Sequence, residues 1–165
     1  MQAGEDKPVV IVTGGGSGIG AAVAERLANS HRVVICGRRR NALDAIAART
    51  GADAVALDVT DHAAAREMVT HTVERHGRLD GLVLNAGIIL SASIAELPIA
   101  DWDRQIAVNL TAPFVMTQAR AATSPGQSRC RGCGELGGRS ANRPRHLGLL
   151  GRQSWNQSVH QMSRL

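Results

Sequence analysis

Tyrosine is absent from this chain of 165 residues, and phenylalanine and lysine occur once each, the lysine as Lys7. Without tyrosine, no phenol can move a proton in a reaction at this chain. Aromatic residues make up only 2% of the sequence, so the bases of a single-stranded nucleic acid would find almost no rings to stack on. A nucleic-acid partner is therefore not the favoured interpretation.

Long apolar runs and a cysteine framework are also missing. No run approaches the roughly 18 residues of a membrane span, and the N-terminal sequence MQAGEDK is too polar for a secretory signal. We therefore expect a cytoplasmic protein that does not enter membranes. Three cysteines, an odd number, favour reduced thiols over disulfides. Cys130 and Cys133 form a CxxC without a second pair at ligand spacing, so no metal site is predicted.

The net charge of +5 is unevenly distributed along the chain. Residues 1–120 contain 12 basic and 13 acidic side chains, whereas residues 121–165 contain seven arginines and one acid. The same boundary separates hydrophobic periodicity from a Gly/Arg/Ser mixture with neither helix nor strand rhythm. We expect a folded domain over residues 1–124 and an irregular basic Gly/Arg-rich tail over residues 125–165.

Short apolar β-type runs recur in the first part, each followed by turn residues and a helical stretch. They lie at residues 9–12, 33–36, 54–57 and 82–84. This alternation predicts an α/β fold, an incomplete Rossmann-like doubly wound parallel sheet that binds ligands at the carboxyl ends of its strands. The third helix is expected over residues 63–76, with Thr60 or Asp61 as its N-cap and Gly77 as its stop.

A long helix is expected from about Asp101 to Ala121, and Pro113 lies inside it. Proline has no N–H to donate, and its ring clashes with the carbonyl four residues earlier, which belongs to Asn109. The sequence therefore predicts a kink that leaves the Asn109 carbonyl free to hold a water molecule or a ligand.

The segment TGGGSGIG, residues 13–20, links the first apolar run to the first helical stretch. Glycine allows the main chain to approach a pyrophosphate, which then lies on free N–H groups at the helix start. The order of strand, glycine turn and helix predicts a dinucleotide site, and a flexible glycine loop without a ligand is the alternative.

The residues after the second strand bear on the choice of cofactor. They read Gly37-Arg38-Arg39-Arg40, with no acid to accept a hydrogen bond from a ribose hydroxyl. An arginine offers a planar cation to a 2′-phosphate, so the sequence predicts NADP, with NAD less favoured, and Arg38 as the phosphate partner. A solvated basic loop is the alternative.

Several separate motifs between residues 7 and 120 resemble the short-chain dehydrogenase/reductase family. TGGGSGIG is similar to the family's TGxxxGIG turn, Asp58-Val59 to its adenine-contacting pair, Asn85-Ala86-Gly87 to its NAG motif, and Asn109 in VNLTAPF to its active-site asparagine. The resemblance implies an oxidoreductase that transfers a hydride between NAD(P)(H) and a carbonyl or secondary alcohol of a small-molecule substrate. It also implies association into a homo-oligomer.

The resemblance implies one catalytic position, Asn109, and a set of cofactor-binding residues. That set consists of Gly14, Ser17, Gly18, Ile19, Gly20, Arg38, Asp58, Val59, Asn85, Ala86 and Gly87. Simpler roles stay open for two of them. Asp58, or Asp61, would serve as a helix cap, and the Asn85 amide would tie neighbouring strands together.

The family moves the substrate proton with a Tyr-x-x-x-Lys pair, which this chain lacks, so the chain as written is expected to be inactive. Our hypothesis is that the tail is the normal continuation, truncated and translated one base out of frame. Codons re-read from their second base permit SAYxAAKAGIN: Leu149-Leu150 allow tyrosine, Gln153-Ser154 allow lysine, and Trp155-Asn156 force glycine. The alternative is a non-catalytic nucleotide-binding module whose basic tail contacts nucleic acid or an acidic partner.

Overall fold

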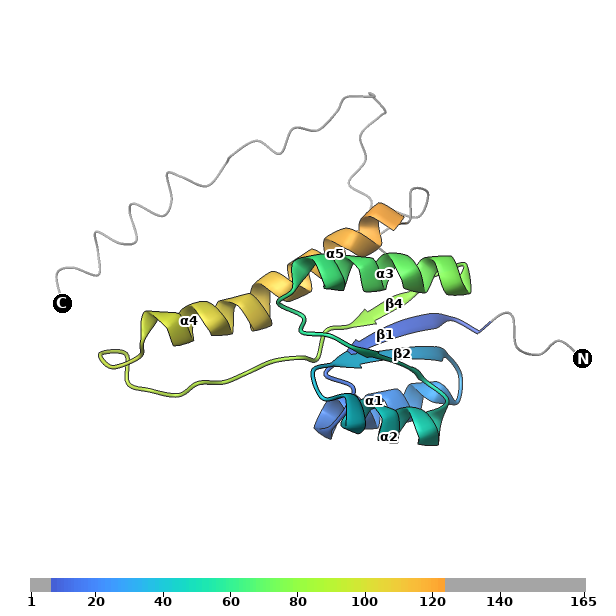
Figure 1. Cartoon of the computed structure of the whole chain (residues 1–165), viewed down its shortest axis with the longest axis horizontal. Helices are drawn as coiled ribbons and strands as arrows, with labels where there is room; N and C mark the ends of the chain where they lie inside the picture. The colour runs from blue at the N-terminus through green and yellow to red at the C-terminus, as the bar shows by residue number, and fades with distance from the viewer. Residues whose placement is uncertain (1–6, 124–165) are drawn as a thin grey trace, which may run out of the picture. The chain divides into compact units, whose positions relative to one another are not determined.

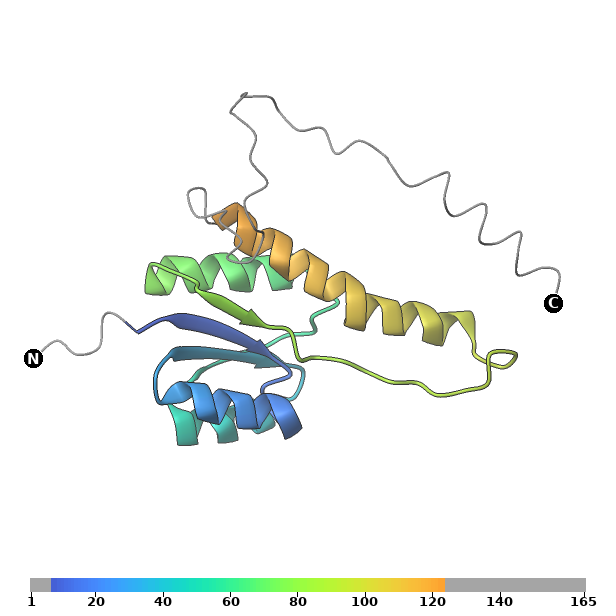
Figure 2. The same ribbon diagram turned by 180° about the vertical axis from the view of Figure 1, so that it is seen from behind.

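The computed structural model describes residues 7–123, all within one compact unit (Figures 1 and 2). Its elements are β1 (Val9–Thr13), α1 (Gly18–Ala28), β2 (Arg32–Gly37), α2 (Arg40–Thr50), β3 (Asp53–Ala56), α3 (His62–His76), β4 (Gly81–Val83), α4 (Ile99–Ile106), η1 (Ala107–Thr111) and α5 (Ala112–Thr123). The tail predicted over residues 125–165, with Cys130 and Cys133, lies outside the described residues.

The four described strands form one sheet in the order β3-β2-β1-β4. Every pairing is parallel, with Ile11 of β1 aligned with Val34 of β2 and Leu82 of β4. Because the chain runs outward from β1 through β2 to β3 and then returns to the other side of β1, the strand order reverses between β1 and β4. The predicted α/β parallel sheet is confirmed, and a reversal of this kind opens a ligand crevice at the carboxyl ends of the strands.

Helices cover both faces of the sheet, α1 and α2 on one side and α3 and α5 on the other (Figure 1). Successive side chains of a strand point to opposite faces, so β1 supplies both cores. Val9 and Ile11 pack in the cluster that includes α3 and α5, whereas Val10 and Val12 pack in the cluster that includes α1 and α2. Burial on both faces explains why β1 and β2 read as nearly unbroken apolar runs, whereas the residues of the outer strands β3 and β4 are at most half-buried.

The ends of α3 match the sequence signals. The Asp61 carboxylate accepts hydrogen bonds from the backbone N–H groups of Ala63 and Ala64, each at 3.1 Å. Asp61 is therefore the N-cap, and Thr60 is not. Gly77 ends the helix in the left-handed conformation with φ +73°, as predicted.

The long helix is irregular just before Pro113. Its segments α4 and α5 are joined by η1, a π-helical stretch in which the backbone N–H of Ala112 bonds the carbonyl of Ala107. Proline cannot donate the next hydrogen bond of the ladder, so the register changes around it. The sequence predicted a kink here, and the structure has a π-helical stretch at this place. Such π-helical turns occur often at functional sites.

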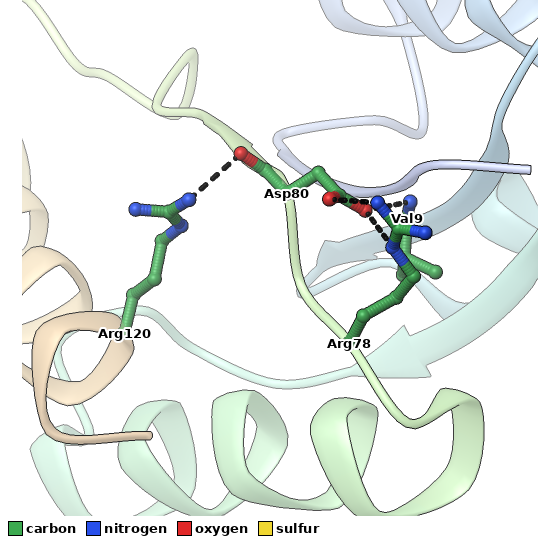
Figure 3. Close-up of polar contacts among 4 residues, drawn as sticks. All are labelled: Val9, Arg78, Asp80 and Arg120. Atoms are coloured by element: carbon green, nitrogen blue, oxygen red, sulfur yellow. Dashed lines mark hydrogen bonds and ion pairs between the residues drawn. The ribbon is translucent and has the colours of Figure 1, made fainter. Parts of the chain in front are cut away.

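Asp80 fixes the start of β4 beside the start of β1 (Figure 3). Its carboxylate accepts from the backbone N–H of Val9 at 2.7 Å and from two guanidinium nitrogens of Arg78 at 2.8 and 2.7 Å. The Asp80 carbonyl accepts from Arg120 of α5 at 2.8 Å. The pKa of the Asp80 carboxyl lies below its ordinary value, with the Arg78 hydrogen bond as the largest cause and the Val9 N–H and the charges of Arg78 and Arg120 as further ones.

No helix between residues 7 and 123 combines the length and apolar character that crossing a membrane requires. Over the same stretch, no group of three or more His, Cys, Asp or Glu side chains is placed to hold a metal ion.

Candidate functional site

A cavity of about 400 Å³ opens at the carboxyl ends of the strands, where the sheet topology places a ligand. Its lining includes eight of the predicted site residues: Gly14, Ser17, Arg38, Asp58, Val59, Asn85, Ala86 and Gly87. Gly18, Ile19 and Gly20 form the start of α1 and do not line it. Asn109 lies instead on a neighbouring cavity of about 560 Å³ that shares Ala86 and Gly87. The structure thus brings segments from four loops to one place.

The glycine turn packs closely against Asn85 and leaves the start of α1 open. Gly14 has φ +67°, and a Cβ added there would lie 2.9 Å from Nδ2 of Asn85. Gly18 has φ +55° at the first position of α1, with nothing within 4 Å of an added Cβ. Ser17, the N-cap residue, makes no side-chain hydrogen bond to the first turn, and that turn has no acidic residue. The helix start therefore offers free N–H groups and a positive dipole end to an anion, which fits a pyrophosphate.

Asn85 joins the carboxyl ends of β1 and β4. Its Nδ2 donates to the carbonyl of Thr13 at 3.0 Å, and the Ala86 N–H donates to Oγ1 of Thr13 at 2.9 Å. The strand-tying role left open for Asn85 is therefore present. The sequence did not lead us to predict that Thr13, only 2% exposed, would accept both of these bonds. The one signal for this role was that a hydroxyl residue ends an otherwise apolar strand.

Two amide side chains hold the loop after β4 against the long helix. Asn109 accepts from the Ile88 N–H at 2.9 Å and donates to the Ile88 carbonyl at 2.8 Å. Gln105, one turn earlier, makes the same pair of bonds to Leu90 at 3.1 and 3.3 Å. Both polar atoms of the Asn109 side chain are thus used in positioning the loop. The role of Gln105 was not predicted.

Two of the three consecutive arginines face the cavity. Arg38 and Arg39 line it, and Nη2 of Arg39 donates to Oγ of Ser17 at 2.8 Å. Arg40 instead bonds both carboxylate oxygens of Asp44 one helical turn along α2, outside the cavity. Sequence reasoning selected Arg38 alone and missed the contact of Arg39 with the glycine turn.

Asp58 presents an ionised carboxylate at the rim of the cavity. Its Oδ1 accepts from the backbone N–H of Thr60 at 3.0 Å and from the Thr60 hydroxyl at 2.8 Å. The pKa of Asp58 lies below its ordinary value, mainly because of the Thr60 N–H, with smaller contributions from the Thr60 hydroxyl and the charges of Arg38 and Arg104. Since Asp61 caps α3, Asp58 is free of that role and available to a ligand.

A family model described as short chain dehydrogenase matches residues 8–129 of this chain. The chain belongs to the short-chain dehydrogenase family. It is 40% identical over 116 residues to an uncharacterized oxidoreductase of Thermotoga maritima, covering 67% of this chain and 45% of that protein. It is 38% identical over 109 residues to the meso-2,3-butanediol dehydrogenase of Serratia marcescens, covering 64% of this chain and 43% of that enzyme.

Among solved structures, the chain resembles a metagenomic short-chain oxidoreductase crystallised in complex with NADP. The TM-score is 0.67 and the sequence identity 35%, over 71% of this chain and 56% of that one. The chain thus spans about half the length of the relatives it matches. The matched residues 8–129 include nearly all of the chain whose geometry is described above.

Proposed function

We propose that this chain binds NADP as the cofactor-binding part of a short-chain dehydrogenase. The observation that carries the proposal is the cavity at the carboxyl ends of the strands, bordered by Ser17 at the uncapped start of α1 and by two arginines, Arg38 and Arg39. One anionic group would lie on the helix start and another beside the arginines. A dinucleotide with a pyrophosphate and a 2′-phosphate supplies both.

The remaining contacts follow from the chemistry of the lining residues. Asp58 would accept a hydrogen bond from the amino group of adenine, next to the backbone of Val59. Asn85, Ala86 and Gly87 would border the ribose and nicotinamide end. When bound, the cofactor supplies a hydride donor or acceptor, while this chain's residues bind and orient it.

NADP is favoured over NAD by the residues that follow β2. No carboxylate stands there to accept from a free ribose hydroxyl or to repel a phosphate, and two guanidinium groups face the cavity. The NADP complex of the related metagenomic oxidoreductase supports the same choice.

For the whole reaction we propose hydride transfer between NADP(H) and a carbonyl or secondary alcohol of a small molecule. The name of the Serratia marcescens relative, a butanediol dehydrogenase, supports an alcohol of this class. Because this chain contains no tyrosine, it has no phenol for the family's proton relay. We expect it to bind the cofactor with little or no turnover, and Asn109 to contribute by holding the loop after β4.

We further propose a cytoplasmic location and association with other copies. Leu110 and Phe114, one turn apart on the long helix, are 63% and 62% exposed, and exposed apolar groups of this size favour contacts between subunits. Sedimentation of the full chain tests the association. A chain that stays monomeric at all concentrations would contradict it.

The test of cofactor binding is a fluorescence titration of the full chain with NADPH and with NADH. We expect saturable binding of both, with NADPH tighter. No binding of either would contradict the proposal, and tighter NADH would contradict the choice of cofactor. The alternative function rests on residues 125–165, outside the described part. Salt-dependent RNA binding that disappears on deletion of residues 121–165 would favour it.

A further inference from the structure

One wall of the cavity at the strand ends comes from the long helix, which contains none of the nucleotide-binding motifs found in the sequence. Arg104 and Val108 line the cavity from the long helix, Arg104 from α4 and Val108 from η1. Residues four apart on a helix lie on the same face, so one face of the long helix borders the same space as the glycine turn and Asp58.

Arg104 is a cation of this wall without an ion-pair partner among residues 7–123. Its side chain is exposed and makes no hydrogen bond or ion pair with any residue between 7 and 123. Its charge nevertheless reaches the Asp58 carboxylate, which it helps to keep ionised. Arg38, from the loop after β2, acts on the same carboxylate from a different element. Asp58 thus lies within the electrostatic reach of two arginines that have separate positions in the fold.

We propose that Arg104 is a cofactor-binding residue that packs its guanidinium plane against the adenine base of the dinucleotide. The inference rests on the proposed function, in which Asp58 accepts from the adenine amino group. A base with its amino edge at Asp58 would lie in the part of the cavity that Arg104 borders. A guanidinium plane stacks on aromatic rings and attracts them electrostatically, and Arg104 has no competing partner among the described residues to give up.

Packing on the base and pairing with a phosphate have different consequences. A contact to the base is common to NADPH and NADH, whereas a contact to the 2′-phosphate exists only with NADPH. The ratio of the two affinities therefore reports which group Arg104 contacts. A merely structural role for Arg104 would show as lowered thermal stability of the free protein.

The experiment titrates the full chain and three variants with NADPH and with NADH: Arg104→Leu, Arg104→Lys and the control Arg26→Leu. Arg26 is exposed in the last turn of α1, away from the cavity, and its loss changes the net charge equally. Cation–π contacts predict that Arg104→Leu weakens both cofactors by a similar factor, about 2- to 30-fold. Arg104→Lys should recover only part of the lost affinity, because lysine restores the positive charge but not the planar guanidinium group.

Several results would overturn the inference. They are unchanged affinity in Arg104→Leu, a loss confined to NADPH, an equal loss in Arg26→Leu, or full recovery in Arg104→Lys. A fall in the melting temperature of Arg104→Leu that accounts for its weaker binding would also overturn it. If the wild-type chain binds neither cofactor, the proposed function and this inference fail together, whereas normal wild-type binding with any of the results above removes the inference alone.

Discussion

Asn109 and Ile88 are joined by two hydrogen bonds across 21 residues of sequence, one from the backbone N–H of Ile88 at 2.9 Å and one to its carbonyl at 2.8 Å. Gln105 repeats the pattern on Leu90. Two amides one helical turn apart thus bind alternate residues of an extended loop, as a neighbouring strand would. Among the described residues, the loop that leaves β4 beside the cavity is held by side chains and not by a neighbouring strand.

This arrangement predicts how the loop responds to truncation of either amide. Asn109→Ala should raise hydrogen exchange at the Ile88 amide, and Gln105→Ala should raise it at Leu90. The expected increase in the exchange rate is about 2- to 10-fold, because one hydrogen bond makes a net contribution to stability of about 0.5–1.5 kcal/mol. Asn29→Ala, at the exposed end of α1, is the control and should leave both amides unchanged. Unchanged exchange in the first two variants would show that the loop is held by other contacts.

The arginines after β2 give a prediction with an internal control. Arg38→Ala and Arg39→Ala should each weaken NADPH binding about tenfold or more while changing NADH binding little, because only NADPH carries the 2′-phosphate. Arg40→Ala should change neither affinity, since Arg40 pairs with Asp44 outside the cavity. Isothermal titration calorimetry of the three variants measures both affinities. Equal effects of all three substitutions would point to a general charge effect and not to a phosphate site.

Gly18 allows a test of the helix start in which only charge differs. Asparagine and aspartate both tolerate positive φ better than other side chains, and an added Cβ at Gly18 has open space. Gly18→Asn should bind NADPH more weakly than wild type, and Gly18→Asp at least about fivefold more weakly still, because its carboxylate repels the pyrophosphate. Thermal stability should not be lower for the aspartate variant, since an acid favours a helix N-terminus. Equal affinity of the two variants would argue against an anion at this position.

The sequence predicted those features that local chemistry determines. The predicted strands differ from the observed ones by at most one residue at either end. For β1 and β2 the reason is burial on both faces, which leaves an unbroken apolar run. Asp61 and Gly77 were recognisable because a cap depends on residues within one turn. The glycine turn and the residues after β3 and β4 were found as linear motifs at strand ends, where parallel topology gathers ligand contacts.

The missed features depend on residues that meet only in the folded chain. Arg39 reaches Ser17 across 22 positions, and Asp80 reaches Val9 across 71. Neither contact has a period or a local motif. The residues Gln105 and Arg104 read as the polar surface of a helix, and their roles follow from how the long helix lies beside the loop after β4. Such roles need the three-dimensional arrangement.

The frame-shift hypothesis makes a prediction about the coding DNA. Reading the gene one base later from about codon 125 should place a tyrosine codon across Leu149-Leu150 and a lysine codon across Gln153-Ser154. Sequencing of codons 115 to 165 from the source DNA measures this directly. Other codons at those two places would remove the hypothesis and leave the basic tail as a genuine part of the protein.

Asp80 predicts how stability changes in acid. Its pKa is lowered in the folded chain by Arg78 and the Val9 N–H, so the carboxylate binds its proton less readily when folded than when unfolded. The stabilisation is therefore complete above the ordinary aspartate pKa of about 4 and is lost as pH falls through the lower folded value. Asp80→Asn should reduce the free energy of unfolding at pH 7 by about 1–2 kcal/mol. It should also make that free energy fall less steeply below pH 4.

Asp58→Asn is the comparison, because the Asp58 pKa is lowered too, but by a local bond to Thr60. Asp58→Asn should also make the free energy of unfolding fall less steeply below pH 4, and it should lower that free energy at pH 7 by less than Asp80→Asn does. Urea unfolding between pH 2.5 and 7 measures the free energy of unfolding of both variants. If this free energy falls as steeply below pH 4 in Asp80→Asn as in the wild type, the contact between the starts of β1 and β4 does not depend on this charge.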